Sequence, residues 1–188
     1  MQGTLEQLDI YGLSDVMYEV GGRMSRYMMY LYGSNVSPRD MHLTESPHPD
    51  VVFLGQDLID GNLAKKFQET GNTIHFSHRL VNLQQDVNGV KAIIDCEGVE
   101  QTFWFKYVVG CDGPRSTSRT FTNCDFEPVK TGKYVWQVDA ALKWKRLKTM
   151  KQMWLYYYEN GFGAIIHLPN NITKVMVFEP KESLANRQ

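Results

Sequence analysis

Residues 107–119 read Tyr107-Val108-Val109-Gly110-Cys111-Asp112-Gly113-Pro114-Arg115-Ser116-Thr117-Ser118-Arg119. The apolar residues at the start of this stretch predict a buried strand, and Ser116 is of the residue type that caps a helix. Glycines at 110 and 113 allow a sharp turn or a close approach to a ligand, and free amides at a helix start suit phosphate or hydroxyl groups. The stretch therefore predicts a polar, ligand-facing corner at a strand's carboxyl end, although strand, turn and capped helix also occur together without a ligand.

The residues before this corner predict two helical regions and two strands. Apolar residues recur there at separations of three to five residues, the spacing that gathers side chains on one helical face, with a break expected at Gly12. The predicted helices span 4–20 and 56–69, the predicted strands 27–32 and 51–54, and the predicted loop, which holds three prolines, 33–49.

Strand signals dominate from residue 73 onward. Asp86-Val87-Asn88-Gly89 supplies a hairpin turn, because Asn-Gly tolerates positive φ. After Cys124 helix signals are few, and turn residues separate the apolar runs, so an antiparallel meander is expected. The predicted strands are 73–76, 79–85, 90–96, 101–109, 134–142, 152–159, 162–168 and 173–178.

The composition argues against several classes of partner. A formal net charge of -1 provides no positive field for nucleic acid or an anionic membrane. No stretch approaches the roughly 18 consecutive apolar residues of a membrane span, and the N-terminus has no secretion-signal pattern. The basic cluster consists of Lys143, Lys145, Arg146, Lys148 and Lys151. It is compatible with nucleotide phosphate, RNA or a membrane surface, but a solvated connection is the favoured interpretation. We therefore expect a cytoplasmic protein with no nucleic-acid partner and no membrane span.

Cysteines and histidines form no metal or disulfide pattern. The three cysteines are Cys96, Cys111 and Cys124. Their spacing predicts reduced packing residues. His75 and His78 would face opposite ways on a strand, so no metal site is predicted there. His42 and His48 are expected to be solvated in their loop.

The stretch 107–119 resembles the Asp-Gly fingerprint of the flavoprotein aromatic hydroxylases, the class that includes p-hydroxybenzoate and phenol hydroxylases. The shared pattern is an apolar pair, Gly, any residue, Asp-Gly, two residues, Ser, two residues and Arg. In that family the segment lies beside FAD and is implicated in NAD(P)H binding. The resemblance implies cofactor-binding roles for Asp112, Gly113 and Arg119.

Two further stretches match the family in order and spacing. Residues 4–13 resemble the helix after the family's first nucleotide-binding unit. Residues 54–60 resemble a strand-to-helix junction at which the family has a Gln near the flavin. The resemblance implies a cofactor-binding role for Gln56, with Asp60 where the family often has Glu, and an ordinary helix-start residue is the alternative for Gln56.

The resemblance implies an α+β fold, that of a truncated α/β family member: helices and part of an FAD-binding domain, then an antiparallel substrate-side sheet. We expect a partial FAD-binding domain over 1–123, interleaved with the substrate domain near 27–55, and the substrate-binding sheet over 124–188. The family's G-x-G-x-x-G and its second flavin-contacting Gly-Asp segment are absent from the sequence. The chain is therefore expected to be an internal portion of an enzyme and incomplete for catalysis.

In this family an antiparallel sheet forms the floor of the pocket that holds an aromatic ring. Along the predicted strand 152–159, Trp154, Tyr156 and Tyr158 share one face because strand side chains alternate. A tyrosine can both stack on a ring and donate a hydrogen bond, so Tyr156 and His167 are the predicted substrate-binding residues, with simple packing as the alternative. No catalytic residue is assigned, and no metal is expected.

The resemblance thus implies an oxidoreductase, an FAD-dependent aromatic monooxygenase in which NAD(P)H reduces the flavin and oxygen is transferred to a phenolic or polyketide-like ring. The expected partner is a small aromatic substrate, and a homodimer is the candidate assembly. The alternative is a non-catalytic small-molecule binding module derived from that family. Nucleic-acid binding is the least favoured hypothesis.

Overall fold

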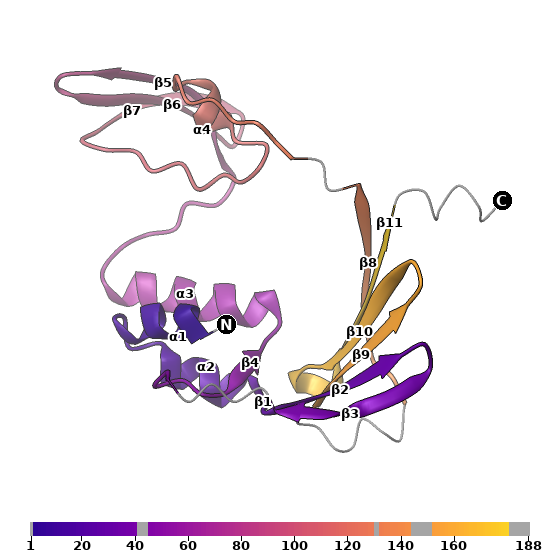
Figure 1. The fold of residues 1–188 in the computed structure, drawn as a ribbon. Coiled ribbons are helices and arrows are strands. Elements are labelled where there is room, and N and C mark those ends of the chain that lie inside the picture. The colour runs from indigo at the N-terminus through magenta and orange to yellow at the C-terminus, as the bar shows by residue number, and fades with distance from the viewer. Residues whose placement is uncertain (1, 41–44, 130–131, 144–151, 181–188) are drawn as a thin grey trace. The chain divides into compact units, whose positions relative to one another are not determined.

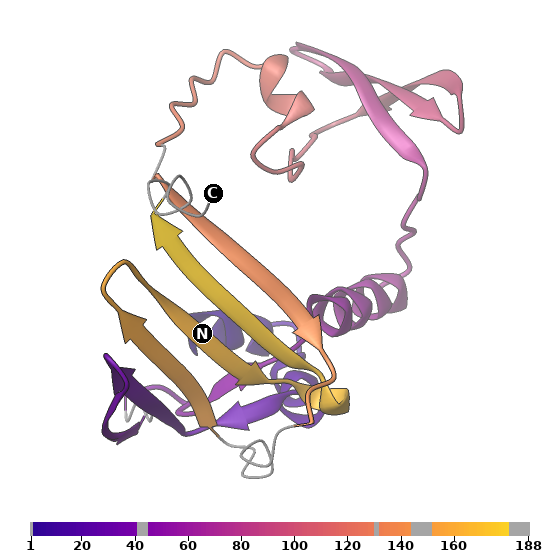
Figure 2. The same cartoon turned by 90° about the vertical axis from the view of Figure 1, so that its right-hand side faces the viewer.

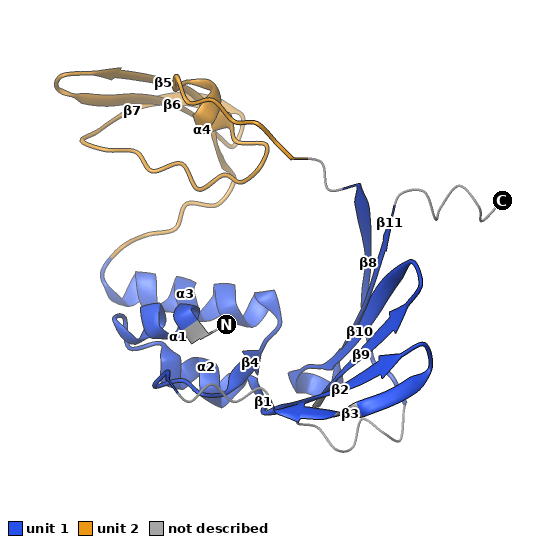
Figure 3. Cartoon of the chain, in the orientation of Figure 1, with its two compact units in different colours: residues 1–71, 131–188 blue, residues 72–130 orange. Residues whose placement is uncertain are grey.

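The chain forms two compact units in its computed structural model (Figure 3). The structure describes residues 2–40, 45–129, 132–143 and 152–180. The first unit contains residues 1–71 and 131–188, and the second contains residues 72–130. Most of the basic cluster predicted around residues 143–151 lies outside the described residues, as does His42.

The described residues of the first unit include three α-helices (Figure 1). They are α1 (Gln2–Asp9), α2 (Ser14–Val20) and α3 (Gln56–Glu69). Gly12 has a φ of 65° between α1 and α2, so the predicted break falls at the residue best able to adopt that conformation. Met17 on α2 is fully buried, which anchors the helix pair on the unit's interior. No helix among the described residues has the length and apolarity needed to cross a bilayer.

A two-stranded ladder links these helices to the larger sheet. Strand β1 (Gly22–Met24) pairs antiparallel with β4 (Val51–Phe53). Met24 then packs with Ile166 and Leu168 in a buried apolar cluster. The core therefore lies where the small ladder meets one end of the large sheet.

The larger sheet has six strands in the order β3-β2-β9-β10-β11-β8 (Figure 2). The strands are β2 (Arg26–Leu31), β3 (Ser34–Asp40), β8 (Lys133–Ala140), β9 (Gln152–Tyr158), β10 (Gly161–His167) and β11 (Thr173–Pro180). A short 3-10 helix, η2 (Pro169–Asn171), joins β10 to β11. All neighbours are antiparallel except β2 and β9, which run parallel. The α+β class and the antiparallel sheet expected late in the chain are confirmed.

The predicted loop 33–49 is wrong in its first part, because β3 occupies Ser34–Asp40. Tyr32 and Gly33 both have positive φ and form a tight two-residue turn that folds β3 back on β2. Pro38 is tolerated because β3 is an edge strand, where a missing N–H need not break a ladder.

His48 is buried, so its predicted solvation is wrong. Its Nδ1 lies 3.1 Å from the Tyr18 hydroxyl, and its Nε2 lies 2.5 Å from Asp9 Oδ2. Hydrogen bonds from Ser14 and then from His48 lower the pKa of the Asp9 carboxyl. These contacts fasten the segment before β4 to α1 and α2 across about 30 to 39 positions of sequence, which no local pattern reveals.

The second unit is an antiparallel meander followed by a short helix. It contains β5 (His78–Asp86), β6 (Gly89–Cys96), β7 (Val99–Phe105) and α4 (Thr117–Thr120). The β5–β6 turn forms as predicted, with Asp86 Oδ1 accepting the backbone N–H of Asn88 at 2.7 Å. The predicted strand at 73–76 is wrong, since the described strands of this unit pair only with one another and leave it no partner.

The cysteines differ from one another in their surroundings. Cys96 is buried on β6 and acts as the predicted packing residue. Cys111 and Cys124 are exposed, so a packing role for them is wrong. All three are free thiols.

Candidate functional site

The predicted strand leading into the Asp-Gly corner stops early. Strand β7 ends at Phe105, and residues 107–113 are irregular. The cause lies in the neighbouring strand: β6 begins at Gly89, and Val90 pairs with Phe105. No further β6 residue is left to pair beyond Phe105. The chain therefore continues past the end of the meander, and its next apolar residues, Tyr107, Val108 and Val109, are exposed.

The Asp112 carboxylate organises the corner from within. Ser116 Oγ donates to Asp112 Oδ1 at 2.5 Å, and Ser118 Oγ donates to the same oxygen at 2.8 Å. The backbone N–H of Ser118 donates to Asp112 Oδ2 at 2.8 Å. Three donors therefore satisfy this side chain inside its own loop.

These donors also fix the ionisation of Asp112. The hydrogen bond from Ser116 is the largest cause, followed by the backbone N–H and then the hydroxyl of Ser118, and together they hold the pKa of the Asp112 carboxyl well below its usual range. Hydrogen bonds to a carboxylate favour its charged form, so Asp112 is an anion at neutral pH.

Ser116 serves both Asp112 and the helix that follows. Its Oγ accepts the backbone N–H of Arg119 at 3.0 Å, which satisfies one free amide of the first turn of α4. Ser116 and Ser118 are both buried, and their hydroxyls lie 3.1 Å apart. The cap predicted for Ser116 is therefore present and is continuous with the Asp112 network.

Two glycines of the corner have different surroundings. A Cβ at Gly110 would lie 2.9 Å from Ser118 Cβ and closer still to Ser118 Oγ, so the backbone approaches Ser118 as only glycine can. Gly113 has a φ of 78°, and apart from its chain neighbours no atom of the described residues lies within 4 Å of the position of its absent Cβ. Gly110 thus allows internal packing, whereas Gly113 presents open backbone.

Arg119 braces the corner from the other side. Its guanidinium donates to the Pro114 carbonyl oxygen at 2.7 Å and lies 4.2 Å from the centre of the Phe126 ring. A guanidinium over an aromatic face is a favourable cation–π contact. Arg119 therefore ties the turn after Gly113 to the segment that follows α4.

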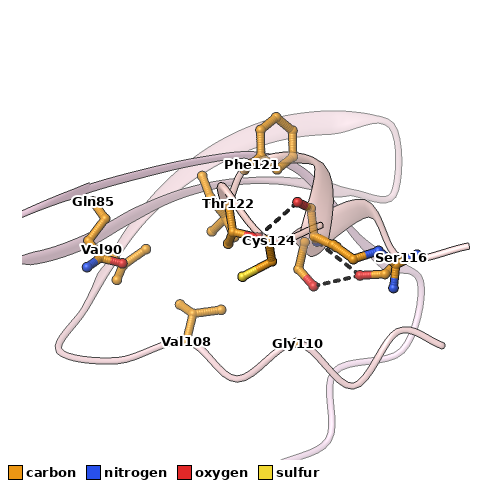
Figure 4. A pocket seen from close by; sticks show the side chains of 11 residues that line it. Gln85, Val90, Val108, Gly110, Ser116, Phe121, Thr122 and Cys124 are labelled. Carbon is orange, nitrogen blue, oxygen red and sulfur yellow. Dashed lines mark hydrogen bonds between the residues drawn. The ribbon is translucent and has the colours of Figure 1, made fainter. Parts of the chain in front are cut away.

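A pocket of about 330 Å³ opens beside this corner, wholly within the second unit (Figure 4). One wall comes from β5 and β6, one from the segment after β7, and one from α4 and the residues after it. In Figure 4 Val108 points toward Cys124 across the pocket. The lining residues are Leu83, Gln85, Val90, Val108, Gly110, Ser116, Ser118, Arg119, Phe121, Thr122 and Cys124. Of the predicted cofactor residues, Arg119 lines this pocket, and Gly113 and Asp112 lie in the adjoining turn.

Gln56 belongs to the other unit. It is the first residue of α3, and its Nε2 donates to Asp60 Oδ1 at 2.8 Å on an exposed helix face. The two residues that the family pattern places at this junction therefore bond to each other. The structure therefore brings Gln56 together with Asp60, whereas Asp112 belongs to the other unit.

Tyr156 and His167 lie on one face of the six-stranded sheet. Tyr156 stacks on Tyr30, with ring centres 4.8 Å apart and planes 11° apart. The Nδ1 of the buried His167 lies 3.1 Å from Thr173 Oγ1. In register, Tyr156 pairs with Gly163, four residues from His167, so the two predicted substrate residues are roughly 13 Å apart along the sheet.

Ser118 is the residue of the corner that sequence reasoning missed. It donates twice to Asp112 and packs on Gly110, yet it occupies one of the two unspecified positions between Ser and Arg in the fingerprint. A second serine six residues after an aspartate could have drawn attention to it, because short hydroxyl side chains near Asp form local hydrogen bonds in turns.

Comparisons with known proteins give a consistent family. The model of a family described as an FAD binding domain matches residues 1–188. A rifampicin monooxygenase from Rhodococcus hoagii is 35% identical over 126 residues, which cover 66% of this chain and 25% of that protein. A 12-dehydrotetracycline 5-monooxygenase/anhydrotetracycline 6-monooxygenase from Streptomyces rimosus is 29% identical over 129 residues, which cover 65% of this chain and 24% of that protein.

Solved structures with low sequence identity share the fold. The p-nitrophenol 4-monooxygenase of Pseudomonas putida superposes with a TM-score of 0.84 at 15% identity, covering 100% of this chain and 49% of that one. A flavin-dependent monooxygenase solved with FAD and substrate gives a TM-score of 0.75 at 19% identity, covering 95% of this chain and 35% of that one. This chain thus spans about a quarter of the length of the curated relatives and at most half of these two structures. Because the family match extends from residue 1 to residue 188, the chain belongs to the FAD binding domain family.

Proposed function

We propose that this chain forms part of an FAD- and NAD(P)H-dependent monooxygenase that hydroxylates an aromatic, phenolic or polyketide-like substrate. The observation that carries the proposal is the family match over the whole chain, which includes an Asp-Gly corner built around Asp112. The relatives named as monooxygenases of rifampicin and of tetracycline intermediates support the substrate class.

Two features of the corner support a dinucleotide role, although the Asp112 carboxylate is already engaged within its own loop. It accepts hydrogen bonds from Ser116 and Ser118. Gly113 presents backbone with open space in front of it, and Arg115 is exposed beside it. A glycine backbone and a neighbouring cation suit the polar groups of a nucleotide, so the residues present fit part of FAD or NAD(P)H.

Bound FAD would supply the redox chemistry, and the residues of the corner would hold and orient it. Gly113 would let the cofactor approach the backbone, and Arg119 would keep the turn in shape through Pro114 and Phe126. Gln56 would contact the cofactor from the start of α3, where Asp60 already orients its side-chain amide. In this proposal Asp112 preserves the shape of the corner.

The sheet would provide the substrate side. Tyr156 has a ring already aligned with Tyr30, and an aromatic substrate could extend this stack. His167 Nε2 is buried and has no hydrogen-bond partner among the residues that the structure describes, although Nδ1 faces Thr173. A buried nitrogen of this kind is suited to a ring hydroxyl, because leaving it unsatisfied costs about 1 to 3 kcal/mol.

The proposal is tested by FAD titration of the purified chain, followed by flavin fluorescence, with Arg119→Ala and Arg79→Ala compared. Arg79 is the matched control, since it lies in the same unit but outside the corner. Its guanidinium nitrogen lies 3.0 Å from the Asp95 carboxylate. Loss of a charged hydrogen bond is worth about 1.5 to 3 kcal/mol, so Arg119→Ala should weaken binding by about 10- to 100-fold. Measurable FAD binding that is equal in the two variants would contradict a cofactor role for the corner.

A non-catalytic binding module is the second candidate function. The engagement of the Asp112 carboxylate within its own loop favours it, because that side chain is not directed at a ligand. Such a module would bind phenolic ligands with unchanged affinity in the presence and absence of FAD. NAD(P)H-dependent oxygen uptake stimulated by a phenol would exclude this candidate.

We also propose a cytoplasmic location and a homodimeric assembly. Three free thiols, two of them exposed, are typical of a reducing compartment and support the location. Fractionation of the native host would test the location, with recovery in an extracellular or membrane fraction as the contrary result.

A further inference from the structure

A buried polar cluster fastens the segment before β4 to α1 and α2. His48 is buried there, with Nε2 at 2.5 Å from Asp9 Oδ2 and Nδ1 at 3.1 Å from the Tyr18 hydroxyl. The ionised Asp9 carboxylate only accepts hydrogen bonds, so Nε2 carries the proton and donates. Two positions before His48, Ser46 donates to Glu6 Oε1 at 2.7 Å and accepts the backbone N–H of His48 at 3.1 Å. The segment is thus bound to α1 twice and to α2 once.

Strand β4, which follows this segment, is held on both faces (Figure 1). Because side chains alternate along a strand, Phe53 lies on one face and Val52 and Leu54 lie on the other. Phe53 packs against the buried apolar cluster of the unit. On the opposite face, a Cβ at Gly21 would lie 2.5 Å from Leu54 Cδ2 and closer still to Val52 Cγ1, so the end of α2 approaches β4 as only glycine can. The strand therefore has little freedom to slide against α2.

Tyr18 joins the cluster to β4 by a second route. Its hydroxyl faces His48, and the Arg23 guanidinium lies 4.4 Å from the centre of its ring, a favourable cation–π contact. Arg23 belongs to β1 and pairs with Val52 in the ladder between β1 and β4. A displacement of His48 is therefore transmitted to β4 both along the chain and across Tyr18 and Arg23.

The held strand leads directly into the start of α3. Gly55 follows it, and the Gly55 carbonyl oxygen accepts the backbone N–H groups of Leu58 at 3.2 Å and Ile59 at 3.3 Å. Gln56, the first residue of α3, lies inside this turn. The place of Gln56 therefore follows from the course of β4, which the contacts with α1 and α2 determine.

We propose that His48, through its bond to Asp9, is a positioning residue of the cofactor site and acts on Gln56 by way of β4. The inference rests on the proposed cofactor role of Gln56 and adds the contacts that hold this residue in place. His48 acts at a distance, because its bonds are made to α1 and α2, whereas Gln56 donates to Asp60 within α3.

NMR spectroscopy of the full chain tests the positioning without flavin. His48→Ala removes both side-chain bonds, so the side-chain amide signals of Gln56 should move. Amides of the first turn of α3 should exchange about tenfold faster or more, because a hydrogen bond to a charged group is lost. The control is Gly161→Ala, whose Cβ would meet the Phe178 carbonyl oxygen on the sheet of the same unit. Gln56 signals that stay as in the parent chain, or that move equally in the control, would overturn the proposal.

Conservative variants separate the two bonds of His48. His48→Gln keeps a donor near the position of Nε2 for Asp9, whereas His48→Asn keeps an acceptor near the position of Nδ1 for Tyr18. The bond to Asp9 is the stronger one because its acceptor is charged. Glutamine should therefore restore the Gln56 signals of the parent chain, and asparagine should not. A glutamine variant whose Gln56 signals match those of His48→Ala would count against the proposal.

FAD titration links the positioning to the cofactor through a double-mutant cycle of Gln56→Ala and His48→Ala. If His48 acts through Gln56, the double variant should bind FAD as Gln56→Ala does, and His48→Ala should weaken binding by no more than the about 2- to 10-fold expected for one neutral hydrogen bond. Additive losses would show that His48 acts by another route and would sink the proposal. Unchanged FAD binding in Gln56→Ala, with Gln56 signals still moved by His48→Ala, would refute the cofactor role of Gln56 and support its positioning by His48.

Discussion

Replacing Gly110 with alanine should destabilise the second unit through Ser118. The added Cβ would lie 2.9 Å from Ser118 Cβ and nearer still to Ser118 Oγ. Ser118 is buried and its hydroxyl is held by Asp112 at 2.8 Å, so it cannot rotate away without breaking that hydrogen bond. Either the side chain is compressed or the Asp112 network opens.

The size of the effect follows from the compression of Ser118. Overpacking a filled site costs about 1 to 3 kcal/mol. A loss of about 1 to 3 kcal/mol corresponds to a roughly 5- to 150-fold larger population of the opened state. Gly110→Ala should therefore accelerate amide exchange across residues 72–130 by that factor and leave the first unit unaffected.

Hydrogen exchange followed by mass spectrometry separates the two units and is the suitable assay. A double-mutant cycle with Ser118→Ala removes the nearest clashing atom, so Gly110→Ala and Ser118→Ala should couple by about 0.5 to 3 kcal/mol. Gly113→Ala is the control, because nothing lies within 4 Å of its Cβ position and its cost should add independently of Ser118. Unchanged exchange in Gly110→Ala, or an additive cycle with Ser118→Ala, would refute the packing argument.

Three further predictions concern pH and packing. Hydrogen bonds depress the pKa of folded Asp112, so their stabilising effect is full above the unfolded pKa of about 3.9 and is lost as pH falls from there through the folded pKa. Asp112→Asn should therefore make amide exchange in residues 72–130 less sensitive to acid. An acid profile identical to that of the parent chain would count against this prediction. Ile166 lies in the buried apolar cluster, so Ile166→Ala should lower the unfolding free energy of the first unit by about 2 to 5 kcal/mol in urea titrations. As a control, Val138→Ala at an exposed position should change that free energy by less than about 0.5 kcal/mol. Gly161→Ala should destabilise the β10–β11 pairing, because its Cβ would collide with the Phe178 carbonyl oxygen; unaltered protection of β10 amides would show that the backbone can move aside.

Local patterns predicted the elements whose partners are near in sequence. The apolar spacing over 56–69 coincides with α3, and the Asn88-Gly89 turn joins β5 to β6 where expected. The late strands were also found, because each alternates or runs apolar between turn residues. In such elements side-chain periodicity and turn chemistry act within a few residues, so the sequence is sufficient.

Contacts with other segments, some near and some far in sequence, explain the errors. Strand β3 is polar and contains Pro38, and it becomes a strand only because the Tyr32-Gly33 turn lays it against β2. His48 is buried because Asp9 and Tyr18 meet it from helices far back in the chain. Conversely, the apolar residues up to Val109 predict a strand, but the pairing with β6 ends at Phe105. Tertiary pairing, which local propensity does not encode, decided each case.

The same distinction bears on the aspartate of the fingerprint. The Asp112 carboxylate accepts bonds from Ser116 and from two groups of Ser118, so it is held by its own loop, and its lowered pKa reflects those internal donors. The part of the corner that is open to a ligand is the backbone of Gly113, which has a φ of 78°. Asp112 therefore holds the shape of the corner, and we propose that it acts on a bound dinucleotide through that shape. On this reasoning Ser118, although absent from the fingerprint, should matter to the corner as much as Ser116 does.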